Sequence, residues 1–143
     1  MVPPAVWAEV TQRIERLGAM AVGTAGWIRA ADLDETGKLT ASVLRQIQHD
    51  PGESEAIALA VQAGADLVLM DEALGRRTAK AMGLNVTGTL GLILRAWRQG
   101  LLSDPQESLR HLQHEGLWVS DALMGWFSAQ VRRQGDGKET GRE

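Results

Sequence analysis

The stretch Asp50–Arg77, DPGESEAIALAVQAGADLVLMDEALGRR, contains the helix and the strand that decide the fold. Asp50 is suited to cap a helix, because its side chain accepts a hydrogen bond from a backbone N–H of the first turn. Pro51 fits the first helical position, and Glu53 falls three residues after the cap, as in a capping box. The apolar residues between Ala56 and Ala63 form the body of this helix.

A short buried strand is expected after this helix. Gly64 is the expected helix end, and Leu67–Met70 is an apolar run short enough to be a strand covered on both faces. This strand ends on an acid, Asp71, and another helix is expected from about Ala73 to Met82. The next expected strand is Asn85–Thr87.

Two further helices and one strand are expected on the N-terminal side. The first helix opens at Pro3 and Pro4, where a missing N–H costs little, and Gly18 is its expected end. A strand is expected at Trp27–Arg29, before the second helix. The apolar residues expected on the buried faces of the two helices are Val6, Val10, Ile14, Leu17, Leu39, Val43, Leu44 and Ile47.

Three more helices are expected on the C-terminal side, over Thr89–Gln99, Pro105–Glu115 and Ser120–Arg133. Asp104 and Ser120 are the expected caps of the second and third of these helices, and the apolar stripe expected in the core is Leu90, Ile93, Leu94 and Trp97. The polar, glycine-rich tail 134–143 is expected to be disordered. Residues 1–133 are therefore expected to form a single domain.

The order of these elements predicts an α/β fold. Strands that alternate with helices through short connections form a parallel sheet. Ligands of such sheets bind outside the carboxyl ends of the strands. Asp71 lies at such an end, which makes it a candidate site residue.

The composition is that of a soluble globular domain. The chain has 143 residues, of which 44% are hydrophobic and 23% charged, and a formal net charge of −3. A negative balance argues against tight, nonspecific binding to phosphates. No apolar run approaches the ~20 residues that span a bilayer, so no membrane association is expected. The absence of cysteine excludes disulfides and zinc–thiolate sites, and it fits a cytoplasmic protein.

Four segments of the chain resemble the PIN-domain superfamily: PPAVWAEV (3–10), WIR (27–29), GESEAIALAVQAGADLVLMDEALGRRTAKAMGLNVTGTLGLILRAWRQGLL (52–102) and GLWVSDAL (116–123). The likeness is strongest to its short bacterial and archaeal branch, which is related to VapC-type toxin ribonucleases. The resemblance implies a three-layer α/β/α fold around a parallel sheet. It implies RNA cleavage by three or four carboxylates that hold Mg²⁺ or Mn²⁺, and it suggests a small antitoxin partner and a homodimer.

The resemblance places the catalytic metal ligands at Glu9, Glu53 and Asp71, with Glu55 as a further candidate ligand. The residues by themselves also allow plainer roles. Glu53 suits a capping box, Asp71 can cap the next helix, and Glu9 and Glu55 can be surface charges. Glu53 and Glu55 lie about 200° apart around a regular helix, so both cannot face one ion.

A cluster of basic residues follows Asp71 within the next expected helix. Arg76, Arg77 and Lys80 are candidates for contact with nucleic-acid phosphates, and the alternative is a solvated helix face. His111 and His114 are expected to be solvated, because no carboxylates at ligand spacing accompany them.

The chain departs from the family pattern at its start. The family begins with a central strand that ends in an aspartate, and here Met1 is followed at once by the PPAVWAEV element. An N-terminally truncated domain that lacks this strand is therefore expected, and whether it is an enzyme stays open. One function is a Mg²⁺- or Mn²⁺-dependent ribonuclease, the toxin of a toxin–antitoxin pair. The other is a noncatalytic PIN-like remnant or protein-interaction module.

Overall fold

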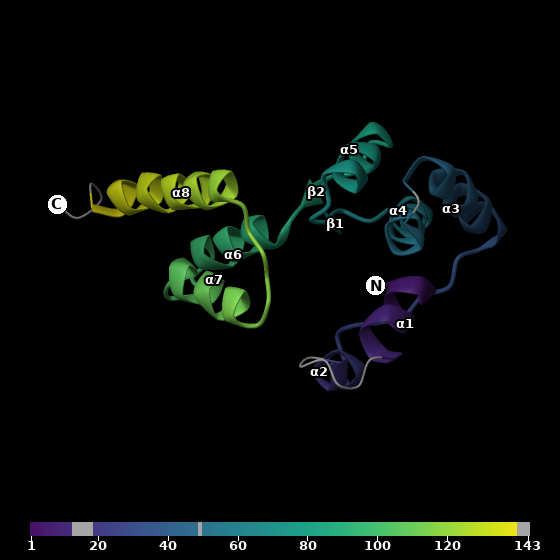
Figure 1. Cartoon of the computed structure of the whole chain (residues 1–143), viewed down its shortest axis with the longest axis horizontal. Helices are drawn as coiled ribbons and strands as arrows, with labels where there is room; N and C mark the ends of the chain where they lie inside the picture. The colour runs from purple at the N-terminus through teal and green to yellow at the C-terminus, as the bar shows by residue number, and fades with distance from the viewer. Residues whose placement is uncertain (13–18, 49, 140–143) are drawn as a thin grey trace. The chain divides into compact units, whose positions relative to one another are not determined.

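The computed structural model describes residues 1–12, 19–48 and 50–139. Its elements in chain order are α1 Pro4–Gln12, α2 Ala19–Thr24, α3 Glu35–Gln48, α4 Pro51–Ala63, β1 Val68–Leu69, α5 Ala73–Ala81, β2 Val86–Thr87, α6 Thr89–Arg98, α7 Pro105–His114 and α8 Asp121–Glu139 (Figure 1). The chain divides into two compact units, Met1–Thr87 and Gly88–Glu143. The single domain predicted over residues 1–133 spans both units and stays a prediction.

β1 and β2 form a short parallel pair in which Val68 lies opposite Val86. The Val68 N–H donates to the Asn85 carbonyl at 2.8 Å. Beyond the end of β1, the Met70 N–H donates to the Thr87 carbonyl at 2.9 Å. α5 is the crossover that parallel neighbours require. The predicted α/β fold with a parallel sheet is therefore confirmed.

α1 begins at the prolines, as predicted. Val6 and Val10 are half-buried on it. Ile14 and Leu17, which were expected on the same face, and the expected end at Gly18 lie outside the described residues.

The strand predicted at Trp27–Arg29 is wrong. The chain turns at this point, and the Ile28 N–H donates to the Ala25 carbonyl at 3.0 Å. The extended backbone comes at Ala30, which forms an isolated parallel bridge with Val2. Gly26, directly before Trp27, favours a turn over a strand at this point. α2 lies just before this turn and has no counterpart among the predicted elements.

α4 is the central helix of the first unit, and buried residues lie on several of its sides. Two clusters meet on it, one of Leu44, Ile57, Ala60, Val68, Met70 and Ala79 and the other of Leu33, Ala41, Ala58 and Leu59. Its ends are those predicted. The Asp50 side chain accepts a hydrogen bond from the Glu53 N–H, and Gly64 closes the helix in the left-handed region at φ 58°.

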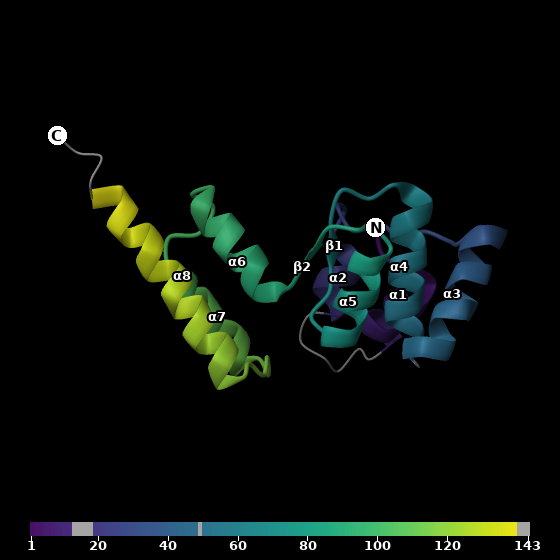
Figure 2. The ribbon, with the colours of Figure 1, turned by 90° about the horizontal axis from the view of Figure 1, so that it is seen from above.

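The buried face predicted for α3 is largely wrong. Only Leu44 is buried, and the others are exposed: Leu39 (69%), Val43 (63%) and Ile47 (56%). Gly37 and Ala41 join Leu44 on the buried face. Figure 2 shows α3 beside α4. A Cβ at Gly37 would come within 2.5 Å of the Gln62 Oε1, so the end of the Gln62 side chain occupies the space beside this glycine.

α6, α7 and α8 form the second unit around its own core. The cluster consists of Leu90, Ile93, Leu94, Leu109 and Phe127, with Trp97 packed against it. The stripe predicted on the first of these helices is therefore a core stripe. Asp104 caps α7 by accepting hydrogen bonds from two backbone N–H groups, and the Ser120 Oγ accepts one at the start of α8. Both caps are those predicted.

α8 extends to Glu139, beyond the end predicted near Arg133. The helix therefore includes part of the tail 134–143 that was expected to be disordered, and residues 140–143 lie outside the described residues. Glycine costs a helix interior about 1 kcal/mol without ending it, and the intervening Gln, Lys and Glu residues favour helix.

Candidate functional site

Two of the candidate acids, Glu53 and Asp71, lie where α4 begins and where β1 ends. Asp71 follows β1 after one intervening residue, Met70, and its side chain is exposed. Glu72 comes next and occupies the N-cap position of α5. Both acids therefore lie at the carboxyl end of the parallel pair, the edge at which α/β sheets bind ligands.

Glu53 extends from the first turn of α4 towards α5. Its backbone N–H donates to the Asp50 Oδ1 at 2.8 Å, which is the capping contact predicted. Its carboxyl group lies against Gly75, because a Cβ at Gly75 would stand 2.6 Å from the Glu53 Oε2. The same Cβ would stand 2.5 Å from the Met70 Sδ. The absence of a side chain at Gly75 therefore provides the space that Glu53 occupies.

The Glu53 carboxyl has an unusual electrostatic environment. Burial raises its pKa above the ordinary value of 4.5, since the charged form is less well solvated there. The negative charges of Asp50 and Glu72 raise the pKa further. The charges of two carboxylates at two helix beginnings thus act on Glu53, and a bound cation would relieve this repulsion.

Glu9 approaches the same helix beginning from α1. A Cβ at Gly52 would lie 3.9 Å from the Glu9 Oε2 and 3.4 Å from the Val6 Cγ2. The exposed Glu9 carboxylate therefore lies beside the first turn of α4, the turn that carries Glu53. The structure brings these two candidates to the same helix end.

Glu55 has a different set of neighbours. Its Oε2 accepts a hydrogen bond from the Ala5 N–H at 2.8 Å, and its Oε1 pairs with the Arg45 guanidinium at 2.6 Å. Its side chain is only 13% exposed. Glu53 contacts α5, whereas Glu55 contacts α1 and α3, as the angle between them on a helix requires.

The three basic candidates all lie on α5. The half-buried Arg76 donates from Nη1 to the Met70 carbonyl at 3.0 Å, which holds its guanidinium at the end of β1 beside Asp71. Arg77 and Lys80 are exposed. Arg76 lies near the end of β1, whereas Lys80 lies in the last turn of α5, at the other end of the helix. Exposed positive charges on a helix are suited to contact a phosphate backbone.

The fit of a divalent metal to this edge is incomplete. The candidates offer carboxylate oxygens, the donors that Mg²⁺ and Mn²⁺ prefer. Over residues 1–12, 19–48 and 50–139, however, no three acid, histidine or cysteine side chains lie close enough together to hold a metal ion. The donor chemistry therefore agrees with the predicted cofactor, whereas the arrangement of the described side chains does not complete a site.

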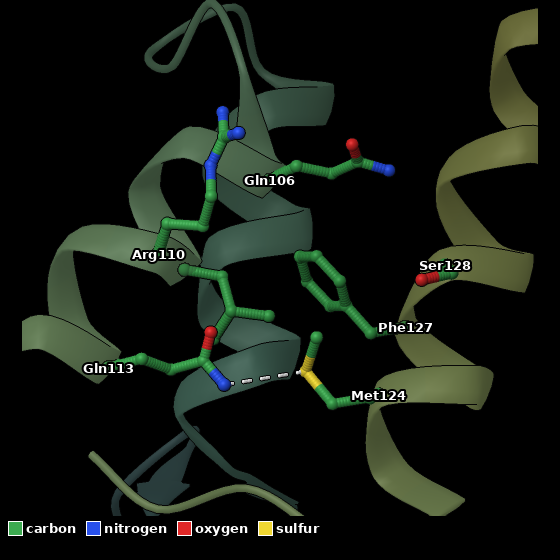
Figure 3. A pocket seen from close by; sticks show the side chains of 7 residues that line it. Gln106, Arg110, Gln113, Met124, Phe127 and Ser128 are labelled. Carbon is green, nitrogen blue, oxygen red and sulfur yellow. Dashed lines mark hydrogen bonds between the residues drawn. The ribbon is translucent and has the colours of Figure 1, made fainter. Parts of the chain in front are cut away.

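A hollow of about 200 Å³ lies between α7 and α8 in the second unit (Figure 3). It is lined by Gln106, Leu109, Arg110, Gln113, Met124, Phe127 and Ser128. The Gln113 Nε2 points across it to the Met124 Sδ at 3.8 Å. None of the seven candidate residues lines this hollow. His111 and His114, on the same helix, are exposed as predicted.

Sequence reasoning missed two contributors to the site. Gly75 was not singled out, although a glycine inside a helix often marks a close approach. Glu72 was not among the candidates either; it is exposed, and its charge raises the pKa of Glu53. The first signal was present in the sequence, whereas the second depends on how α4 and α5 pack.

Comparison with known proteins gives one family. A family model described as a PIN domain matches residues 1–132 of the chain. No curated protein and no solved structure gives a further match. No helix in the described part of the chain is long and apolar enough to cross a membrane. Membership of the PIN-domain family implies nucleic-acid binding and suggests a nuclease-type function. With a match over nearly its whole length and a parallel α/β fold, the chain belongs to the PIN-domain superfamily.

Proposed function

We propose that this protein is a ribonuclease of PIN type that requires Mg²⁺ or Mn²⁺. The observation that carries the proposal is the position of Glu53, whose carboxyl lies at the carboxyl edge of the parallel pair under the influence of Asp50 and Glu72. Repelling carboxylates at a ligand-binding edge are suited to attract a cation. Asp71, after the end of β1, and Glu9, beside the first turn of α4, would supply further oxygens.

The chain's own residues would first bind and orient RNA. Arg77 and Lys80 would contact phosphates, and Arg76 would present its remaining N–H donors beside Asp71 while it stays bonded to the Met70 carbonyl. If Glu53, Asp71 and Glu9 held a divalent ion, the chemistry that it would supply is the activation of water for attack on a phosphodiester.

Cleavage of single-stranded RNA by the purified protein with Mn²⁺ tests the proposal. Asp71→Asn keeps the shape of the side chain and removes its charge, so we expect cleavage to be lost. Asp66→Asn is the matched control, because Asp66 is an exposed acid just before β1 and should not contribute. Equal cleavage by the parent and Asp71→Asn would contradict the proposal.

A second function has one observation in its favour. The described side chains contain no three-ligand group, which suits a noncatalytic PIN-like interaction module. Such a module predicts no cleavage and no stabilisation by Mn²⁺. Cleavage that depends on Asp71 would exclude it.

We also propose that the ribonuclease acts as the toxin of a toxin–antitoxin pair, as a homodimer that a small antitoxin protein inhibits. The support is the resemblance of residues 52–102 to a short bacterial and archaeal branch of the PIN superfamily that is related to VapC-type toxins. Induced expression should arrest bacterial growth, and Asp71→Asn should restore it. Light scattering after size-exclusion chromatography should give twice the mass of 15.5 kDa.

A further inference from the structure

The first turn of α1 has an N–H group whose acceptor comes from another helix. The first turns of helices lack intrahelical acceptors for their N–H groups. Pro3 and Pro4 have no N–H, so Ala5 is the first residue of α1 that has one. Its acceptor is the Glu55 Oε2, fifty positions along the chain, at 2.8 Å. Glu55 therefore caps α1 from α4.

The other oxygen of Glu55 binds a third helix. The Glu55 Oε1 accepts from the Arg45 Nη2 of α3 at 2.6 Å. Glu55 is 13% exposed and Arg45 45% exposed, so this ion pair is partly shielded from solvent. One carboxylate thus connects α1 and α3 to α4, and each of its oxygens has a donor.

The bond from the Ala5 N–H to Glu55 also affects where Glu9 lies, because both residues belong to α1. Ala5 and Glu9 are four residues apart, so they lie one turn apart on the same side of α1. Val6 and Glu9 are also the residues of α1 closest to the position of a Gly52 Cβ, at 3.4 and 3.9 Å. A contact that holds Ala5 against α4 therefore also sets where the Glu9 carboxylate lies beside the first turn of α4.

We infer that Glu55 is a positioning residue that holds α1 on α4 and thereby places Glu9, and that it is not itself a metal ligand. The inference rests on the proposed function only in giving Glu9 a role. Its structural part, the dependence of the α1–α4 contact on Glu55, stands by itself.

Two measurements test the structural part. The exchange rate of the Ala5 amide reports the cap directly. The chain has no cysteine, so disulfide formation in a Val6→Cys, Gly52→Cys variant reports how often α1 lies on α4. Glu55→Ala should make the amide exchange about tenfold faster and the disulfide about tenfold slower to form, since a hydrogen bond to a charged acceptor is removed.

Glu55→Gln serves as the conservative variant. It keeps an oxygen acceptor for Ala5 and loses the charge, so the cross-link should persist while the Ala5 amide exchanges about fivefold faster. Glu35→Ala is the matched control, because Glu35 is exposed and pairs with Lys38 of its own helix. An unchanged Ala5 exchange rate in Glu55→Gln overturns the inference even if Glu55→Ala does not fold.

The link to Glu9 is tested by a double-mutant cycle in RNA cleavage. If Glu55 acts through Glu9, Glu9→Gln should reduce cleavage in the parent and have little further effect in Glu55→Ala. Additive effects of the two changes would overturn the positioning role. A parent that does not cleave RNA would defeat the proposed function alone, because amide exchange and cross-linking would still decide whether Glu55 holds α1.

Discussion

The carboxyl group of Glu53 lies directly against Gly75, so α4 and α5 meet at a point where α5 has no side chain. Gly75 is buried, and the Met70 sulfur borders the same space. An acidic side chain is thereby kept at the carboxyl edge of the parallel strands, where burial and neighbouring charges raise its pKa. The backbone of Gly75 is ordinary α-helix, which any residue can adopt. The need for a glycine here therefore comes from the lack of space for a side chain and not from the backbone conformation.

Gly75→Ala should destabilise the fold. The added Cβ would stand 2.5 Å from the Met70 Sδ and 2.6 Å from the Glu53 Oε2, and both groups must move. Overpacking of this kind costs about 1–3 kcal/mol, measurable as a lower midpoint in urea unfolding. The control is Gly125→Ala in α8, where a Cβ meets nothing within 4 Å. That change should stabilise by about 0.5–1 kcal/mol. Equal effects of the two changes would contradict the close contact.

Glu53→Gln should stabilise the protein at neutral pH. The folded-state pKa of Glu53 is raised above 4.5, so the folded state favours the protonated form. Its contribution to stability is present below the unfolded pKa and is lost as the pH rises through the folded pKa. Glutamine stays neutral throughout, so the melting temperature of the variant should exceed that of the parent by about one or two degrees at pH 7. The difference should vanish below pH 4.5, and a constant difference would contradict the electrostatic cause.

The two aspartate caps should contribute similar stability in the two units. Asp50 accepts from one N–H of α4, and Asp104 accepts from two N–H groups of α7 at 2.7 and 3.2 Å. Replacement of either by alanine removes these bonds and should cost about 1 kcal/mol in urea unfolding. Replacement by asparagine keeps an acceptor and should cost less. A loss that is the same for alanine and asparagine would show that the acceptor is not responsible.

Sequence alone predicted α4, its two ends, and the parallel pairing of the strands around α5. These features depend on interactions between residues close in sequence, such as the bond from the Glu53 N–H to Asp50 and the left-handed backbone of Gly64. The position of Asp71 at the carboxyl edge followed from the same local order, whereas Glu9 and Glu53 became candidates through the resemblance to PIN domains. That these acids bind a metal stays a prediction.

The remaining features depend on contacts between distant residues. α3 turns its small residues to α4, so the larger Leu39 and Val43 are exposed, and hydrophobicity alone predicts the opposite. Glu55 is the same residue type as Glu53 and lies two positions away on the same helix. Its partners Ala5 and Arg45 nevertheless come from other helices. Side-chain volume and long-range hydrogen bonding decided both cases.

Addition of Mn²⁺ should raise the melting temperature of the parent if the acids bind a cation. A ligand at a hundred times its Kd stabilises by about 2.7 kcal/mol, which corresponds to roughly 5–10 °C for a chain of this size. Asp71→Asn and Glu53→Gln should each reduce this shift, because each removes a charge at the carboxyl edge. Asp104→Asn, in the second unit, should retain it. A shift that survives in both site variants would place the cation elsewhere, and the absence of any shift in the parent would favour the noncatalytic module.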